Sequence, residues 1–413
     1  MLRHTAHPTE PRYEVLALFT VSMIAASLVV VAIGTLLPYV ATAFPNERAH
    51  IGLVVTAILL GGTFSNAFTG AATDRFGDKA VLIACGLVMG LSLIAASAVP
   101  SFNWMLAWFI VYGAAFAAIN PVGSHAILFF FKPEERGLAM GVRQMGMPLG
   151  GVIGAIVLST AGEYVGYRGA LAIAGILVLI VMMAAAALYR EPPQLYGKPV
   201  RAGVLLEDVL RIGRDRRLML VTLVCIALFA SQVALMGFFP WTLVNQAHTT
   251  PEFASLVFVI TQFAAAAARI FWGWCSDRVF HGHRVLPLAI TCVLCALAAI
   301  CVANVAHMPI PVLAAVAVLL GFSAEGWFGV AIVAMAEIGG EEQAGSALGF
   351  GLTWIFAAGV LTPPLFQLVM QHAGIPAAWH TLAIVSLLGL VPAAGVIGPA
   401  KTQGSVSRPR PIS

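Results

Sequence analysis

The stretch "TGAATDRFGDK", Thr69–Lys79, places two acidic and two basic residues within six positions of an otherwise apolar chain. Only 10% of the 413 residues are charged, whereas 60% are hydrophobic, above the roughly 45–50% apolar content of soluble domains. A similar stretch, "FWGWCSDRVFHGHR", occupies Phe271–Arg284. A repeated charged segment in such a chain indicates short polar turns between membrane-spanning helices.

The apolar runs support this interpretation, because a spanning helix needs about 20 mostly apolar residues and the chain supplies that length repeatedly. A bilayer requires every backbone polar group to be satisfied internally, so we predict an all-α bundle. The twelve expected helices are Tyr13–Phe44, Ile51–Ala71, Ala80–Val99, Met105–Phe131, Gly137–Ala161, Gly169–Tyr189, Leu218–Asn245, Phe253–Cys275, Val285–Val305, Pro311–Ala336, Gly345–Met370 and Trp379–Pro399.

The loop charges predict the orientation, because Lys and Arg are retained on the cytoplasmic side of a membrane. With a cytoplasmic N-terminus, only Arg48 and Arg168 fall in outside loops, so we expect both termini in the cytoplasm and a multi-pass inner-membrane location. The expected organisation is an N-tail (1–12), a six-helix half (13–189), a basic cytoplasmic linker (190–217), a second six-helix half (218–399) and a C-tail (400–413).

The two charged stretches indicate an internal duplication, since their offset is nearly half of the chain. The residues that recur with one offset of 203 are Gly70 with Gly273, Asp74 with Asp277, and Arg75 with Arg278. A second pair of segments, "EERGLAMG" at Glu134–Gly141 and "EEQAGSALG" at Glu341–Gly349, is displaced by 207 or 208. We therefore predict two pseudo-symmetric halves.

Two six-helix halves with Gly-x-x-x-Asp-Arg-x-Gly-x-Lys between the second and third helices resemble the major facilitator superfamily. The resemblance implies that this loop latches the two halves together on the cytoplasmic side. Asp74 would engage the start of the eleventh helix, Arg75 and Lys79 would tether nearby helix ends, and Asp277 would face the start of the fifth. This sequence has Asp78 where the family usually shows a base, and the alternative is that the charges only hydrate a turn. The predicted gate residues are Gly70, Asp74, Arg75, Gly77, Lys79, Arg136, Arg143, Gly273, Asp277 and Arg278.

Such a fold implies alternating access to a midplane site by rocking one half against the other. The chain contains no Walker-type GxxxxGK[ST] motif, so we expect a solute or proton gradient rather than ATP to drive it. We expect no enzymatic activity and no cofactor or metal. The formal charge of +4 reflects the loop bias, so nucleic acid is not an expected partner.

Charged residues inside the apolar runs are functional candidates, because each costs at least about 2.5–3.5 kcal/mol at the bilayer centre. Three lie away from the run ends: Arg143, Arg269 and Glu325. Arg269 shares a helix face with Gln262, and its guanidinium fork matches a carboxylate, which indicates an anionic substrate. The alternative is that Arg269 only pairs with Asp277 or Glu325. Arg143 lies near the cytoplasmic end of its helix, where it suits either the gate or helix packing.

The segment "ARIFWGWCSDR", Ala268–Arg278, resembles the oxalate/formate antiporter family and, in its Arg-x-x-x-Gly, the monocarboxylate transporters. The resemblance implies that Arg269 binds a substrate carboxylate. The lysine that those antiporters carry in the eleventh helix has no equivalent here, which argues against a dicarboxylate clamp.

Glu325 suits proton coupling, because burial disfavours the charged form of a carboxyl group. A permanent ion pair with Arg269 is the alternative. The remaining candidates for the cavity are Asn120, Ser124, His125, Ser231, Gln232 and Trp327, with Gln262 and Arg269 as further substrate contacts.

The sequence therefore predicts a monomeric secondary carrier for a small organic anion, a monocarboxylate above all, working by proton symport or exchange. Its partners would be the solute, protons and the lipid bilayer. Proton-driven efflux of hydrophobic compounds is the alternative, because Gly146, Pro148, Gly150 and Gly151 resemble the glycine-and-proline motif of drug/proton antiporters. A membrane receptor on a carrier fold is a third possibility that no added signalling domain supports.

Overall fold

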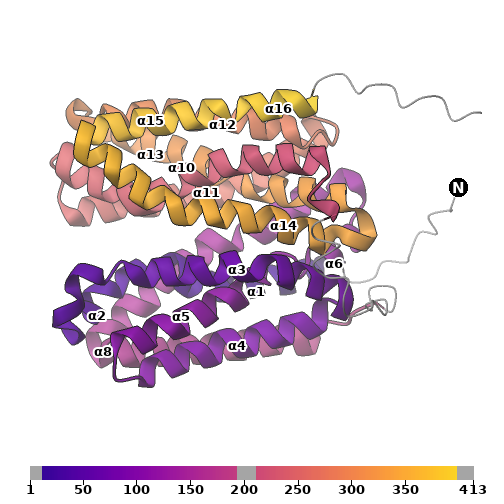
Figure 1. Cartoon of the computed structure of the whole chain (residues 1–413), viewed down its shortest axis with the longest axis horizontal. Helices are drawn as coiled ribbons and strands as arrows, with labels where there is room; N and C mark the ends of the chain where they lie inside the picture. The colour runs from indigo at the N-terminus through magenta and orange to yellow at the C-terminus, as the bar shows by residue number, and fades with distance from the viewer. Residues whose placement is uncertain (1–11, 193–210, 398–413) are drawn as a thin grey trace, which may run out of the picture.

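The computed structural model describes residues 12–192 and 211–397, and every regular element within this part is a helix. The N-terminal half comprises α1 (Arg12–Ala32), η1 (Ile33–Thr35), α2 (Leu37–Ala43), η2 (Pro45–His50), α3 (Leu53–Phe76), α4 (Asp78–Ala98), α5 (Phe102–Ala117), α6 (Ser124–Phe130), η3 (Pro133–Glu135), α7 (Arg136–Gln144) and α8 (Gly146–Leu188). The C-terminal half comprises α10 (Arg216–Gln246), α11 (Pro251–Trp274), the π-helical turn η5 (Cys275–Val279), α12 (Val285–Ala303), η6 (Val305–His307), α13 (Ile310–Ala324), α14 (Phe328–Ala373), α15 (Ile375–Leu388) and α16 (Leu390–Ile397). The halves form two bundles, one above the other in Figure 1.

The spans agree with the twelve expected helices. Eleven helical runs among the described residues are long and apolar enough to cross a membrane. One of them, Pro133–Leu188, has 56 residues, far more than the roughly 20 that one crossing needs. Gly166 interrupts it with a φ of 68°, so this run holds two crossings, the fifth and sixth.

The fourth and tenth crossings differ from the prediction, because each is interrupted where one continuous helix is expected. In the fourth, α5 ends at Ala117 and α6 begins only at Ser124. Pro121 lacks the N–H that a helix needs, and Gly123 has a left-handed φ of 80°. In the tenth, α13 ends at Ala324 and α14 begins at Phe328, with Glu325 in the break. The expectation of uninterrupted helices at Met105–Phe131 and Pro311–Ala336 is therefore wrong, and the expected helix Tyr13–Phe44 is likewise divided into α1, η1 and α2.

Parts of the predicted tails and linker lie outside the described residues. These are residues 1–11 of the N-tail, 193–210 of the linker and 398–413, which include the C-tail. The expected domain boundaries stay predictions.

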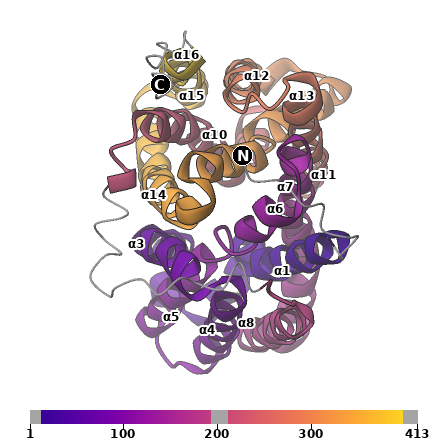
Figure 2. The same cartoon turned by 90° about the vertical axis from the view of Figure 1, so that its right-hand side faces the viewer.

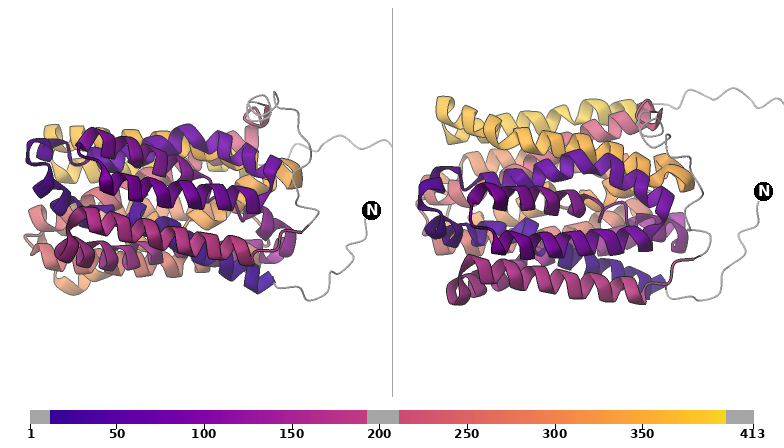
Figure 3. Two further views of the ribbon diagram at one scale, coloured as in Figure 1. Left: turned by 90° about the horizontal axis from the view of Figure 1, so that it is seen from below. Right: turned by 60° about the horizontal axis from the view of Figure 1, so that its bottom comes forward.

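The halves meet through α3 against α14 and through α7 against α11. Both contacts use glycines, because a Cβ on Gly70 would lie 2.1 Å from the carbonyl oxygen of Gly345, and one on Gly273 would lie 2.2 Å from that of Gly137. We call the end of the bundle that holds these four glycines the motif end. Figure 2 faces it, and the two views in Figure 3 show helices of both halves running along one common direction.

Candidate functional site

Asp74 joins the two halves at the motif end. One carboxylate oxygen, Oδ1, accepts a hydrogen bond from the Gly345 backbone N–H at 2.9 Å. The other, Oδ2, accepts from the Ser346 backbone N–H at 2.7 Å and from the Ser346 hydroxyl at 2.6 Å. Gly345 follows Gln343, whose φ of −131° interrupts α14, so these donors belong to a new first helical turn. Free N–H groups and the helix dipole stabilise a carboxylate there, and this is the contact expected from the resemblance.

Asp277 makes the equivalent contact in the opposite direction. Its Oδ1 accepts from the Gly137 backbone N–H at 3.1 Å, and its Oδ2 accepts from the Leu138 N–H at 2.7 Å. Both donors lie in the first turn of α7, the start of the fifth crossing. The duplication in the sequence thus becomes two reciprocal carboxylate caps between the halves, as expected. That these caps act as a gate stays a prediction.

The basic residues of the two motifs behave differently from one another. Lys79 Nζ donates to the backbone carbonyl of Tyr189 at 2.9 Å and so tethers the end of α8, as expected. The Arg75 guanidinium instead lies 5.1 Å from the ring centroid of Phe76, and Arg278 is exposed. Neither Arg75 nor Arg278 bonds a helix end among the described residues.

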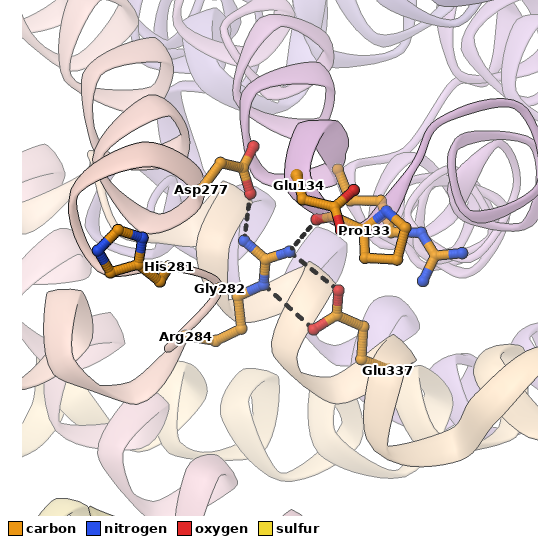
Figure 4. A pocket seen from close by; sticks show the side chains of 8 residues that line it. Pro133, Glu134, Asp277, His281, Gly282, Arg284 and Glu337 are labelled. Atoms are coloured by element: carbon orange, nitrogen blue, oxygen red, sulfur yellow. Dashed lines mark hydrogen bonds and ion pairs between the residues drawn. The ribbon is translucent and has the colours of Figure 1, made fainter.

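Arg284, rather than the predicted gate residue Arg278, is the arginine that binds at this place. Its guanidinium bonds Asp277 through Nη1 and the two carboxylate oxygens of Glu337 at 3.0 and 3.1 Å. It also bonds the Pro133 carbonyl oxygen at 2.9 Å, which ties the C-terminal half to the loop before α7. Burial lowers the pKa of Arg284, but the carboxylates of Glu337 and Asp277 outweigh burial and raise it overall. Figure 4 shows this cluster beside a cavity of about 350 Å³.

Arg284 and Glu337 were missed at the sequence level. Arg284 closes the quoted repeat, so the repeat itself was the available signal. Glu337 lies more than fifty residues further along the chain, in the α14 segment, and nothing in its sequence context indicates the pairing. Arg136, a predicted gate residue, donates to the backbone carbonyls of Leu128 and Phe131 at 2.6 and 3.2 Å and thereby holds the end of α6.

Asp78 explains the departure from the family pattern. Its side chain is fully buried, and its two oxygens accept from the backbone N–H groups of Gly123 and Ala126, each at 3.2 Å. An acid is needed here because the break in the fourth crossing exposes a helix N-terminus inside the bundle. His125 lies between the two motif acids, with Nε2 2.7 Å from Asp74 Oδ1 and Nδ1 3.8 Å from Asp78 Oδ1.

Glu191 completes this acidic cluster. Its Oε1 accepts from the backbone N–H groups of Asp78 at 2.5 Å and Lys79 at 3.4 Å, so it caps α4 as Asp78 caps α6. Burial first, and then the negative charge of Asp78, raise the pKa of Glu191.

Arg269 lies completely buried at the boundary between the halves. Its Nη2 is 3.5 Å from Oε2 of Glu325, and its Nε donates to the Glu325 backbone carbonyl at 3.1 Å. Its Nη1 reaches the other half and donates to the backbone carbonyl of Gln144 at 2.8 Å. Asp277, the other partner considered from the sequence, is bound to Arg284 instead.

Glu325 is also completely buried, in the break between α13 and α14. Gln262 donates through Nε2 to Glu325 Oε1 at 3.0 Å, so the two residues predicted to share a face of α11 both reach this acid. The three side chains form a compact site of one cation, one carboxyl group and one amide. An anion entering it would meet a guanidinium whose only side-chain counterion among the described residues is Glu325.

Arg143 differs from the gate role expected of it. Its guanidinium binds the backbone carbonyls of Ile119 and Val122, the latter at 2.6 Å, and lies 3.4 Å from the sulfur of Met140. All three partners belong to the N-terminal half. The break in the fourth crossing frees these carbonyls, and Arg143 satisfies them.

The other predicted cavity residues are held in different ways. Asn120 Oδ1 accepts from Gln144 Nε2 at 3.1 Å, whereas the Ser124 hydroxyl and the Trp327 indole N–H donate to nearby backbone carbonyls at 2.6 and 2.8 Å. Gln232 is 1% exposed, and neither polar atom of its amide has a hydrogen-bond partner in residues 12–192 and 211–397. Ser231 instead contacts Ser386 at 2.9 Å.

The glycines that resemble a drug-antiporter motif pack α8 against α1. A Cβ on Gly150 would lie 2.4 Å from the carbonyl oxygen of Ile24, and one on Gly146 would lie 2.8 Å from that of Thr20. Close helix approach explains these residues without a role in transport.

Comparisons with known proteins agree with this architecture. The model of the Major Facilitator Superfamily matches residues 18–236 and 221–411. An uncharacterized MFS-type transporter of Mycobacterium tuberculosis is 25% identical over 374 residues, covering 87% of this chain and 78% of the relative. The phosphoglycerate transporter protein of Salmonella typhimurium is 24% identical over 287 residues, covering 62% and 60%. The crystal structure of a human organic anion transporter superposes with a TM-score of 0.78 at 16% identity, covering 93% of this chain and 100% of that one.

Proposed function

The chain belongs to the major facilitator superfamily of secondary transporters, and we propose that it carries a small organic anion, a monocarboxylate above all, coupled to protons. One observation carries this proposal: Arg269 is completely buried, bound to Glu325 within its own half and to the Gln144 carbonyl of the other. A guanidinium cannot lose its charge in a protein, so the site keeps a cation whatever the pH.

The Arg269–Glu325 pair supplies a mechanism for coupling. An incoming carboxylate and the Glu325 carboxylate compete for the same guanidinium, and both cannot be accommodated as anions beside one cation in a buried site. If Glu325 takes a proton, it releases Arg269 and keeps its hydrogen bond with Gln262. Substrate and proton then occupy the site together and are carried in the same direction.

The contact of Arg269 with Gln144 links this chemistry to the movement of the halves. In the present conformation, which is closed at the motif end, one N–H of the Arg269 guanidinium donates to the Gln144 carbonyl of the opposite half. Substrate binding at Arg269 therefore acts on the boundary that must open during alternating access. We assign the motif end to the cytoplasm, because it carries most of the loop Lys and Arg residues.

The relatives provide modest support for an anionic substrate. The Salmonella protein is named for phosphoglycerate, which is an anion with a carboxylate. The resemblance of Ala268–Arg278 to oxalate/formate antiporters and monocarboxylate transporters points in the same direction.

The test is thermal unfolding of the purified protein with a panel of small carboxylates and hydrophobic cations. A ligand at 100 times its dissociation constant stabilises by about 2.7 kcal/mol, so weak binders are detectable. We expect wild type to respond to carboxylates and Arg269→Ala to lose the response. Because Arg269→Ala leaves Glu325 buried and unpaired, the double variant Arg269→Gln with Glu325→Gln serves as the charge-balanced control and should also lose it.

Glu325→Gln alone separates coupling from binding. Wild-type affinity for the carboxylate should fall as pH rises, because binding requires a protonated Glu325, whereas the variant should bind with little pH dependence. If hydrophobic cations alone stabilise the protein, or if Arg269→Ala binds carboxylates normally, the organic-anion proposal is wrong and efflux becomes the better hypothesis.

A further inference from the structure

Asn66 occupies in the N-terminal half the place that Arg269 occupies in the C-terminal half. The constant offset of 203 that relates Gly70 to Gly273 also relates Asn66 to Arg269. The contacts agree, because a Cβ on Gly141 would lie 2.2 Å from the Arg269 carbonyl oxygen, and one on Gly349 would lie 2.6 Å from that of Asn66. Gly141 and Gly349 are themselves equivalent positions of the second repeat. The two residues therefore sit at equivalent depths on the boundary between the halves.

The Asn66 side chain is buried, and among the described residues it has no polar partner. It is 1% exposed, and neither Nδ2 nor Oδ1 has a hydrogen bond within that part of the chain. It lies on the face of α3 that also carries Gly62 and Gly70, which meet Phe356 and Gly345 of α14. A buried polar group without a partner costs about 1–3 kcal/mol, so an amide with two such groups requires a reason to be retained.

The substrate provides that reason. Building on the organic-anion function proposed above, we infer that the Asn66 amide binds a hydroxyl group of a hydroxy monocarboxylic acid whose carboxylate is bound by Arg269. A hydroxyl both donates and accepts, which matches the donor and acceptor of an amide. A second carboxylate would require a second cation, and the position equivalent to Arg269 holds a neutral residue.

This inference assigns different tasks to the two halves. The C-terminal half supplies the charge, through Arg269 with Glu325 and Gln262 around it. The N-terminal half supplies a neutral amide, that of Asn66, at the position equivalent to Arg269. A substrate that contacts both halves must then be charged at one end and neutral but polar at the other. Recognition of its hydroxyl group also rejects acids that lack one, because these leave the amide unpaired.

The test compares butyrate with its alpha-, beta- and gamma-hydroxy derivatives and with succinate. Dissociation constants are measured by isothermal titration calorimetry on the purified full-length protein. We expect at least one hydroxybutyrate to bind wild type about tenfold more tightly than butyrate or succinate. In Asn66→Leu the dissociation constant of that hydroxybutyrate should rise to that of butyrate, whereas the dissociation constant of butyrate should not change. Asn66→Ser should restore part of the difference in affinity between the two acids.

The variants are chosen so that misfolding does not obscure the result. Asn66→Leu replaces an unpaired amide by an apolar side chain of similar size, so it should fold at least as well as wild type. Thr222→Val is the matched control, because the Thr222 hydroxyl is also buried and has no hydrogen-bond partner among the described residues, but it lies elsewhere, beside Gly351. Thr222→Val should still bind the hydroxybutyrate more tightly than butyrate.

The outcomes separate this inference from the function on which it rests. If butyrate binds but no hydroxy derivative binds better, or if Asn66→Leu keeps the preference, the role of Asn66 is refuted and the organic-anion proposal stands. If succinate is the tightest ligand, a hydroxy monocarboxylate is the wrong substrate class. If no acid of the series binds wild type, both proposals fail.

Discussion

Replacing Asp74 by asparagine should open the motif end of the protein. Asp74 accepts three hydrogen bonds from Gly345 and Ser346 across the boundary between the halves. Asparagine keeps one acceptor oxygen and turns an NH2 group toward a backbone N–H donor, so one bond is lost and the others lose their charge. Bonds to a charged group contribute about 1.5–3 kcal/mol and neutral ones about 0.5–1.5 kcal/mol, so one charged bond lost and two bonds reduced to neutral ones give a loss of about 3.5–6 kcal/mol.

That loss corresponds to roughly a 300- to 20,000-fold change in the ratio of the closed to the open motif end. Pulsed electron paramagnetic resonance measures it directly, with spin labels at Phe76→Cys and Val279→Cys. These two exposed residues end α3 and η5, on opposite halves. The partly exposed Cys301 is replaced by alanine, and the other five cysteines are buried. We expect the distance distribution to shift to longer values in Asp74→Asn.

Arg278→Gln provides the comparison, since Arg278 belongs to the same motif but is exposed. It should leave the distribution unchanged. An unchanged distribution in Asp74→Asn would refute the conclusion that the carboxylate caps hold the motif end closed, and an equal shift in Arg278→Gln would refute the distinction drawn between the two residues.

Three further predictions follow from the same contacts. Gly273→Leu should also lengthen the spin-label distance, because a side chain there would meet the carbonyl oxygen of Gly137 at 2.2 Å from its Cβ; a wild-type distribution would contradict this. Arg284→Gln should lower the free energy of unfolding by about 3 kcal/mol, the low end for breaking a buried ion pair because Glu337 is partly exposed. Chemical denaturation of this variant and of the double variant Arg284→Gln with Glu337→Gln checks that value, and the double variant should be little less stable than the single one. If the losses of the two single variants simply add in the double variant, the two residues do not stabilise the protein as a pair. Glu191→Gln should flatten the pH dependence of the melting temperature: the pKa of Glu191 is raised in the folded protein, so wild-type stability falls as pH rises from the ordinary range of a glutamate through that raised value. A variant that keeps the wild-type slope would exclude Glu191 as its source.

Much of the architecture follows from composition and repetition. The number of crossings and the two halves are predictable, because each rests on a local rule, a run length or an offset. The facing of Asp74 and Asp277 toward the partner half is what the resemblance to the major facilitator superfamily implies, and the affinity of a carboxylate for a helix N-terminus is consistent with it. The duplication also relates Asn66 to Arg269, although the importance of that equivalence appears only with the burial of the unpaired amide.

The breaks in the fourth and tenth crossings were not predicted. The length of an apolar run does not distinguish one continuous helix from two short ones. The break in the fourth crossing also changes the roles of two charged residues that lie beside it, Arg143 and Asp78. Arg143, a predicted gate residue, binds the backbone carbonyls that the break leaves free. Asp78, which departs from the family pattern, caps α6, the helix that follows the break.

Sequence alone determined that this protein is a duplicated bundle of apolar helices, with charge concentrated in its turns and at three positions inside the apolar runs, because hydropathy and repeats act over short stretches of chain. Only the tertiary structure decided which charges meet. Arg269 pairs with Glu325 rather than Asp277, and Arg284 rather than Arg278 binds Asp277. The physical reason is that the rotation of each helix about its axis is set by packing against several neighbours at once, and that rotation selects the partner of every buried charge.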